Sequence, residues 1–264
     1  MGLQKTRAVA VGSRPLGEAD KLLTFYTREF GKLRGVAKGA RRVRSKFGSA
    51  LELFTYGQLV FFERPRGELV AVDHFDIIHP FQLLREDLKR LGRGAWVVEC
   101  VTHLTAERDP HPALFGLLLR ALRALEGGAR PERVALSFAL RASDLTGHRP
   151  RLDRCHRCGK LPGRRLRFDP AGGGFLCPDC PASGPGVLPL SSQALSALRR
   201  LRMLRWDERL LVQLPRALEQ EMLAMMAGYL HALIGYALRV DRFLEQTQMR
   251  EGVNGLGEAG GKKR

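Results

Sequence analysis

The first eighty residues alternate short apolar segments with turn sequences, which is the pattern of a compact antiparallel sheet. Five segments rich in Val, Phe, Leu and Thr are predicted to be strands: residues 6–11, 21–27, 32–36, 51–63 and 68–78. Glycine and proline mark the turns, as in the Arg-Pro-Arg-Gly sequence that ends at Gly67. No helical crossover fits between strands this close together. The pattern therefore predicts a sandwich or a small closed barrel, and the strand count fits a five-stranded OB-type barrel.

After His79-Pro80 the apolar residues recur at helical spacing. Helices are predicted over residues 81–107, 112–126 and 130–145, and a cysteine-containing insert follows. Beyond the insert, helices are expected to resume at Ser191, a suitable N-cap, and at Pro215, a favoured first-turn residue. The last helix is expected to run without a break to Arg242 and to carry one apolar stripe: Leu218, Met222, Met225, Tyr229, Leu233, Tyr236 and Val240.

The chain is therefore predicted to have an α+β fold, with an N-terminal barrel and an α-helical C-terminal domain. The expected boundaries place the barrel at residues 1–79, the helical domain at 80–151 and 185–248, and the cysteine-containing insert at 152–184. Residues 249–264 are glycine-rich with a basic end and are predicted to be disordered.

One stretch requires a membrane test, because residues 222–238 contain no charged side chain apart from His231 when it is protonated. Its length is close to the lower limit for a spanning helix. Polar helical sequence leads into it and charged residues continue it, so a helix buried in a bundle is predicted instead. The amino terminus also lacks the apolar core of a secretory signal, and a soluble, cytoplasmic protein is expected.

Charge points to the class of partner. The chain has 44 Lys and Arg against 27 Asp and Glu, a formal net charge of +17, which favours a nucleic acid or an anionic membrane surface. The densest run contains no acid and carries seven cations: Lys32, Arg34, Lys38, Arg41, Arg42, Arg44 and Lys46. Strand-like sequence flanks it on both sides, so a loop and strand edge of the barrel is predicted and not a loose tail.

Taken alone, such a run could be an ordinary solvated surface. Beside a small barrel it matches the usual surface for binding single strands, in which a cationic groove is combined with aromatic side chains on which the bases stack. The nearby aromatic residues, some of which must belong to the core, are Phe25, Tyr26, Phe30, Phe47, Phe54 and Tyr56. A second basic group in the insert, Arg164, Arg165 and Arg167, is the alternative surface for nucleic acid.

The insert carries the sharpest local motif. Cys155 and Cys158 form one CxxC pair, and Cys177 and Cys180 form a second, at the spacing of a four-thiolate zinc site. A turn at Asp169–Gly174 between the pairs completes the pattern of a zinc ribbon. One iron ion or two disulfides are the alternatives. With four protein ligands the zinc would be structural and not catalytic, and Cys100 is expected to be a buried apolar residue.

No motif of an enzyme is found in a suitable context. The sequence has no P-loop, no HExxH and no GxSxG, and its GxGxxG match at Gly255 lies in the tail, after no strand and before no helix. The acids are sparse, although distant ones could still converge in a nuclease site. No enzymatic activity is therefore predicted.

The stretch GEADKLLTFYTREFGKLRGVAKGARRVRSKFGSALELFTYGQLVFF, residues 17–62, closely resembles the amino-terminal domain of the bacterial RecO family. The helical remainder with four cysteines, and the closing sequences Leu230-His-Ala-Leu-Ile-Gly-Tyr and Arg242-Phe-Leu, resemble the family's carboxy-terminal part. Asp241 departs from the pattern, which more often has a small hydroxyl residue there.

The resemblance implies an OB-fold, a helical domain and a zinc ribbon in one chain. It also implies a recombination mediator of the RecF-type repair pathway that binds single- and double-stranded DNA and anneals complementary strands. RecR would be its partner, with which it would help RecA displace single-strand-binding protein. Two other functions are to be tested against this one: a zinc-ribbon factor that binds RNA or the ribosome, and the nuclease. Preference for DNA over strands with 2′-hydroxyl groups separates the recombination mediator from the RNA-binding factor.

Overall fold

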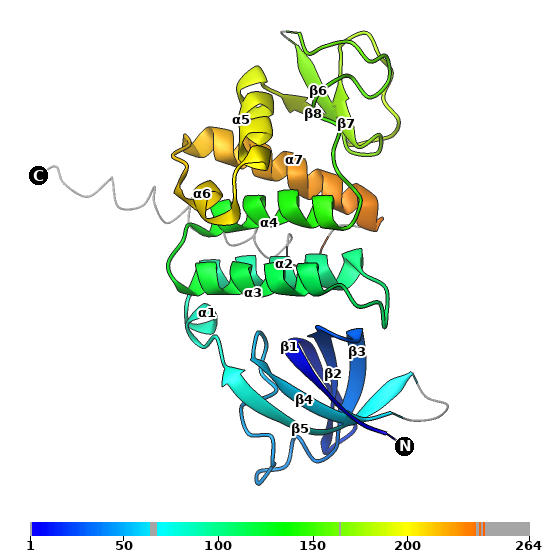
Figure 1. The fold of residues 1–264 in the computed structure, drawn as a ribbon, viewed down its shortest axis with the longest axis vertical. Coiled ribbons are helices and arrows are strands. Elements are labelled where there is room, and N and C mark those ends of the chain that lie inside the picture. Colours follow the sequence, from blue (N-terminus) through cyan, green and yellow to red (C-terminus); the bar gives the residue numbers. More distant parts are fainter. Residues whose placement is uncertain (1, 64–67, 164, 236–237, 239, 241–264) are drawn as a thin grey trace, which may run out of the picture.

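The computed structural model describes residues 2–63, 68–163, 165–235, 238 and 240 (Figure 1). A β-barrel lies at one end of the molecule, a small sheet lies at the other, and layers of helices are stacked between them. The predicted tail, 249–264, lies outside the described residues, as do Tyr236 and the closing sequence from Asp241 onward.

The barrel is closed and has five strands: β1 (Leu3–Leu16), β2 (Asp20–Thr27), β3 (Gly31–Ala37), β4 (Tyr56–Phe62) and β5 (Leu69–His79). Their order around the barrel is β1-β2-β3-β5-β4, with β3 and β5 parallel and the other pairs antiparallel. Alternate side chains point inward because successive residues of a strand face opposite sides. Phe25, paired with Ala10 on one side and Leu33 on the other, is one of these buried residues. The prediction of a five-stranded OB-type barrel is confirmed.

Two strands differ from the sequence prediction by more than one residue at an end. β1 is longer than residues 6–11, because its ends pair with β4 (Leu3 opposite Phe62) and with β2 (Leu16 opposite Asp20). The prediction that a strand starts at residue 51 is wrong, since β4 starts at Tyr56 and turns precede it. Leu51 and Phe54 are apolar because the turns bury them in the core, a role that hydrophobicity alone cannot distinguish from a strand.

The helical part contains α1 (Leu83–Glu86), α2 (Leu88–Leu104), α3 (Pro112–Glu126), α4 (Pro131–Leu145), α5 (Ser192–Met203), α6 (Trp206–Leu211) and α7 (Arg216–Ile234). Ser191 caps α5, as predicted, by accepting a hydrogen bond from the Ala194 amide at 3.0 Å. The single helix predicted over 81–107 is wrong: Asp87 is extended and its carboxylate accepts from the Arg90 amide at 2.8 Å, which starts α2 afresh.

α7 buries one face, which includes Met222, Met225 and Tyr229, against the rest of the bundle. The prediction of an unbroken helix to Arg242 is wrong, because Gly235 adopts a left-handed conformation with φ of 86° and ends α7 at Ile234. Among the described residues, no helix combines the length and the apolar character needed to cross a membrane.

A buried ionic network joins α4 to the segments that follow it. Arg133, with 2% of its side chain exposed, donates from Nε to the carboxylate of Glu219 on α7, which is itself 1% exposed. Its Nη1 donates to the backbone carbonyls of Arg209 and Val212, beside α6. Arg130 reaches the second oxygen of Glu219 at 2.7 Å. Since a lone charge in this position would be costly, the network fixes α4, α6 and α7 to one another.

The barrel and the helices share one interface. Tyr26 of the barrel stacks with Phe115 of α3 at a ring distance of 6.3 Å. The side chain of Lys32, only 16% exposed, donates from Nζ to the carbonyls of Thr102 (2.7 Å) and Thr105 (3.1 Å) at the end of α2. Gly31 has φ of 64°, and a Cβ there would lie 2.3 Å from the carbonyl oxygen of Asp109. This close approach requires glycine.

The small sheet at the far end has three strands, β6 (Leu166–Asp169), β7 (Gly174–Leu176) and β8 (Leu188–Leu190), in the order β7-β6-β8. The β6–β7 hairpin turns at the predicted Asp-Pro-Ala-Gly-Gly-Gly sequence, where Gly173 has φ of 67°. The carboxylate of Asp169 accepts hydrogen bonds from the amides of Gly172 and Ser183, which ties the turn to the segment leading to β8. The four cysteines lie on loops beside this sheet, two before β6 and two directly after β7.

Candidate metal centre and nucleic-acid interface

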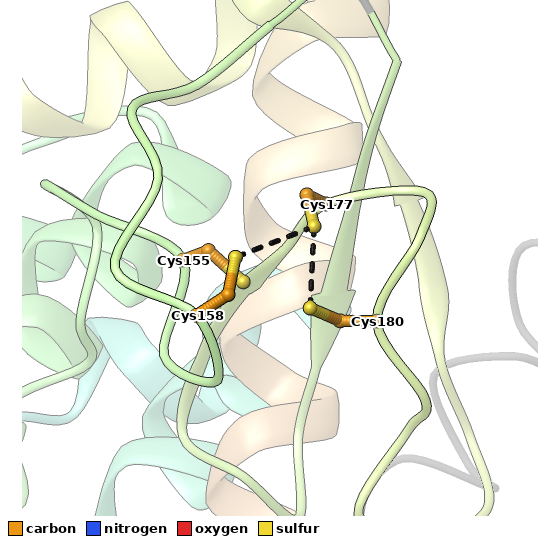
Figure 2. Close-up of side chains that lie close together, drawn as sticks. All are labelled: Cys155, Cys158, Cys177 and Cys180. Atoms are coloured by element: carbon orange, nitrogen blue, oxygen red, sulfur yellow. Dashed lines mark hydrogen bonds between the residues drawn. The ribbon is translucent and has the colours of Figure 1, made fainter.

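The four cysteines of the insert converge on one point. Figure 2 shows Cys155 and Cys158 on one loop and Cys177 and Cys180 on a second, with their sulfurs facing one another. All four Sγ atoms lie within 4.8 Å of one another, with Cys158 and Cys177 at 3.7 Å and Cys177 and Cys180 at 3.3 Å. A disulfide requires about 2.05 Å, and all four cysteines are free. The disulfide alternative is therefore wrong for this structure.

The first of the two loops is a tight turn stabilised by its own backbone. The amide of Gly159 donates to the carbonyl of Cys155 at 2.9 Å, and the amide of Cys155 donates to the carbonyl of Lys160 at the same distance. Gly159 has φ of 73°, which a residue with a Cβ rarely adopts. In the second loop the amide of Cys180 donates to the carbonyl of Cys177 at 3.3 Å. Each CxxC loop thus presents its two sulfurs toward those of the other loop.

The environment favours a thiolate at Cys155 and a protonated thiol at Cys180. Burial raises the pKa of the Cys155 thiol, but hydrogen bonds from the amides of Cys158, Cys177 and Arg157 outweigh it and lower that pKa to about 6. The pKa of Cys180 is raised to about 12, first by its hydrogen bonds with the thiols of Cys177 and Cys158. The thiol protons of Cys158, Cys177 and Cys180 thus lie within hydrogen-bond distance of a neighbouring sulfur. Four sulfurs in such a cluster fit one tetrahedral divalent cation, which would replace those protons and leave no open position.

Arg167 supports the second loop. Its Nη2 lies 3.1 Å from the carbonyl of Cys177, 3.0 Å from that of Pro178 and 2.8 Å from that of Cys180. The sequence offered Arg167 as part of an alternative surface for nucleic acid, which stays a prediction; the structure shows its Nη2 engaged with carbonyls of the second cysteine loop. Arg165 is exposed, and Arg164 lies outside the described residues.

His156 connects the first loop to the hairpin. With 6% of its side chain exposed, its Nε2 lies 3.2 Å from the carboxylate of Asp169, which is fully buried. Its ring packs against Gly172, where a Cβ would lie 2.2 Å from the ring. Sequence reasoning missed this contact. The only signal was the row of glycines after Asp169, whose spacing matched a turn equally well.

The structure divides the seven cations of the basic run into two groups. On β3, Lys32 is docked against α2, and Arg34 lies 3.0 Å from Glu68 and 3.5 Å from Glu107. The other five are exposed on the loop that follows β3: Lys38, Arg41, Arg42, Arg44 and Lys46. We name residues 38–46 the cationic loop.

The cationic loop is folded onto the barrel. The amide of Gly39 donates to the carboxylate of Asp20 at 2.8 Å, and the amide of Arg41 donates to the carbonyl of Ala19 at 2.9 Å. Lys46 lies 3.3 Å from Asp73, and among the described residues the other four cations of the loop have no carboxylate within 4.0 Å. The prediction of a loop inside the domain, and not a loose tail, is confirmed.

The expected stacking platforms are absent from the described part of this surface. Phe25, Tyr26 and Phe54 are 0% exposed and Phe47 is 5% exposed, while Phe30 and Tyr56 are partly buried against the two cores. These aromatic rings fill the barrel and its junction with the helices. The cationic loop therefore offers guanidinium and ammonium groups, together with the fully exposed Val43, and no stacked aromatic ring.

Comparison with known proteins identifies the family. Residues 1–81 match the model "Recombination protein O N terminal", and residues 85–242 match "Recombination protein O C terminal". "DNA repair protein RecO" of Anaeromyxobacter sp. (strain Fw109-5) is 38% identical over 88% of this chain and 91% of its own length. The proteins of the same name from Rubrobacter xylanophilus and Myxococcus xanthus are 39% and 38% identical over 77% and 74% of this chain, and over 82% and 80% of their own lengths. The chain belongs to the RecO family of DNA repair proteins.

Proposed function

We propose that this protein is a DNA-binding mediator of recombinational repair in the cytoplasm, acting on the nucleoid and without catalysing a turnover reaction. It binds single- and double-stranded DNA and anneals complementary strands. With RecR it helps load RecA onto strands coated by single-strand-binding protein. Family membership supports the pathway, and one observation supports the chemistry: five exposed cations, four without a carboxylate partner in the described residues, on a folded loop of a closed barrel.

The composition of the cationic loop indicates how it would hold DNA. Guanidinium and ammonium groups bind phosphate oxygens, which carry no base information, so binding is expected to be independent of sequence. Both single and double strands present phosphates, so both should bind. Five contacts give a log–log salt slope of about −3.5 for single strands, which corresponds to a loss of roughly a hundredfold between about 50 and 200 mM salt.

The test is a salt titration of oligonucleotide binding with a variant carrying Lys38→Gln, Arg41→Gln and Arg42→Gln. Removing three contacts should flatten the slope by about 2 and weaken all sequences about equally. A triple variant with Arg120→Gln, Arg123→Gln and Arg216→Gln removes the same charge from exposed positions on α3 and α7 and should keep most of the slope. Val43→Ser alters the loop without changing its charge and should leave the slope unchanged.

Strand annealing of complementary oligonucleotides, bare or coated with single-strand-binding protein, tests the proposed activity directly. The wild type should accelerate annealing and the loop variant should not, while circular dichroism shows both folded. A loop variant that binds and anneals like the wild type would place the DNA surface elsewhere. Tighter binding to RNA than to DNA would favour the RNA-binding factor, and strand cleavage that depends on a divalent metal would favour the nuclease.

We further propose that the metal held by Cys155, Cys158, Cys177 and Cys180 is one structural zinc ion. A closed tetrahedral thiolate site suits zinc, and such sites supply on the order of 10 kcal/mol of local folding free energy. Elemental analysis of the purified protein should find one zinc per chain and little iron. Cys158→Ser should lower the metal content and loosen the insert, and a metal-free wild type would refute the assignment.

A further inference from the structure

A cavity of about 420 Å³ opens beside the first metal loop, at the end of the molecule opposite the barrel. It is lined by the segment between Arg149 and Gly159, which joins α4 to the insert. Its lining includes three arginines, Arg149, Arg151 and Arg154, and one acid, Asp153, together with Cys155 and His156 of the first cysteine loop. The cationic loop does not contribute to this cavity, so its charge has a separate origin.

The backbone of this wall is held from both sides. The amide of Arg151 donates to the carbonyl of Gly173 at 2.8 Å, and its carbonyl accepts from the amide of Phe175 at 3.0 Å, which joins the segment to the β6–β7 hairpin. Arg199 of α5 donates to the carbonyls of Leu152 and Asp153. The arginine side chains therefore project from a fixed frame, which lowers the ordering cost of binding a ligand.

Within the described residues the three arginines are weakly neutralised. Arg149 reaches Asp144 only at 3.8 Å, and Asp144 is shared with Arg202 at the same distance. Arg154 contacts the carbonyl of Gly159 at 3.4 Å, and no carboxylate of the described residues lies within 4.0 Å of Arg151. Asp153 is drawn away by Arg199, 3.7 Å from it. All three arginines are exposed, and guanidinium binds phosphate in a forked geometry.

We propose that this pocket is a second nucleic-acid site, which takes the phosphodiester backbone of a strand. The inference rests on the proposed function, and it extends that function: one strand lies on the cationic loop and another is held at the far end of the same chain. A free phosphate or a nucleotide shares this chemistry. Two further exposed cations, Arg157 and Lys160, follow the lining segment, and the chain as a whole has an excess of positive charge. Both features favour a nucleic-acid strand over a free phosphate or a nucleotide.

The arginines could instead serve only the metal. Four thiolates and one divalent cation carry a formal charge of −2, and nearby cations would stabilise that centre. The two roles differ in what a variant loses. Substituting Arg149→Gln, Arg151→Gln and Arg154→Gln should leave zinc stoichiometry and thermal stability close to those of the Arg120→Gln, Arg123→Gln and Arg216→Gln control. Loss of zinc in the pocket variant alone would overturn the inference. The single variant Arg151→Gln, at a position whose side chain has no hydrogen bond or ion pair among the described residues, repeats the test where the triple variant fails to fold.

The decisive experiment counts short labelled oligonucleotides bound by full-length, zinc-loaded protein at low salt. The wild type should bind two per chain, and the pocket variant and the cationic-loop variant should each bind one. The salt slope for a long strand should fall by about 2 in the pocket variant, since three contacts at about 0.7 each are lost. Two oligonucleotides per chain in the pocket variant would overturn the inference.

One oligonucleotide on the wild type, lost only in the loop variant, refutes the second site and leaves the proposed function standing. No oligonucleotide on the wild type refutes the proposed function. Inorganic phosphate serves as the competing probe: at millimolar concentration it should displace neither oligonucleotide. If it displaces one, and only from chains that retain the pocket arginines, the pocket is a site for free phosphate and the inference is refuted.

Discussion

Arg167 offers the sharpest test of how the metal loops are held together. Its Nη2 contacts three backbone carbonyls of the second loop between 2.8 and 3.1 Å. One nitrogen carries two hydrogens, so these contacts amount to about two hydrogen bonds, and bonds to a charged donor contribute roughly 1.5–3 kcal/mol each before solvent replaces them. Part of the site is open to water, which recovers some of that free energy. A net loss of about 2 kcal/mol is therefore expected for Arg167→Met.

If the loop orders around the proposed zinc ion, this loss should be measured as weaker zinc binding. About 2 kcal/mol corresponds to roughly a 30-fold lower affinity for zinc, within the range of about 10–100-fold typical of groups that support ligands from outside. The assay is a titration of the full-length protein against a chromophoric zinc chelator. Arg165→Met, an exposed arginine two residues away, is the matched control and should bind zinc like the wild type.

Arg167→Lys adds a graded measurement, since an ammonium can reach the same carbonyls without the planar fork of the guanidinium. It should fall between the wild type and Arg167→Met. If Arg167→Met and Arg165→Met hold zinc equally well, the carbonyl contacts contribute nothing to the metal site, and the reasoning from their geometry is refuted.

Three further changes test the packing. Lys32→Gln removes a mostly buried ammonium from two carbonyls of α2 and should lower the free energy of unfolding by roughly 2–4 kcal/mol, measured in urea. Gly31→Ala places a Cβ 2.3 Å from a backbone oxygen and should lower the melting temperature well below that of Gly17→Ala, where φ is 61° and no atom lies within 4 Å. Glu219→Gln leaves Arg133 without its buried countercharge and should lower the free energy of unfolding by about 3–5 kcal/mol, measured in urea. For any of the three variants, an unchanged unfolding midpoint would contradict the role given to the contact that it removes or crowds.

The four-cysteine cluster was predictable because its determinants are local and chemically specific. Two CxxC pairs separated by a glycine-rich turn specify the four ligands by residue type alone, and the structure places their sulfurs within 4.8 Å. The barrel was predictable for a related reason, since five short apolar segments without a crossover leave few alternatives. The support of the second loop was not predictable. Arg167 looks like any basic residue in the sequence, and its carbonyl partners lie 10–13 residues further along the chain.

The cationic run shows where sequence reasoning stops. Its seven cations are a mixture of Lys and Arg on both sides of Ala37, yet Lys32 and Arg34 lie on a strand and the remaining five lie on a loop. Strand periodicity places Lys32 and Arg34 on the same outward face of β3, but it cannot reveal that α2 and Glu107 cover that face. That cover comes from tertiary packing more than 65 residues away in sequence, at Thr102 and Thr105. The aromatic residues failed as stacking platforms for the same reason.

The docking of Lys32 also bears on how two strands could meet on one chain. Its hydrogen bonds to the end of α2, with the close approach of Gly31 to Asp109, join the barrel to the helices at the base of the bundle. Arg199 and Arg202 of α5 join the helices to the insert by donating to the carbonyls of Leu152 and Pro150. Cationic groups at the two ends are thus carried by one connected frame. If both ends hold phosphates, their separation is set by the protein and not by a linker. A variant that loosens the frame, such as Gly31→Ala, should then slow annealing while each end still binds its own oligonucleotide.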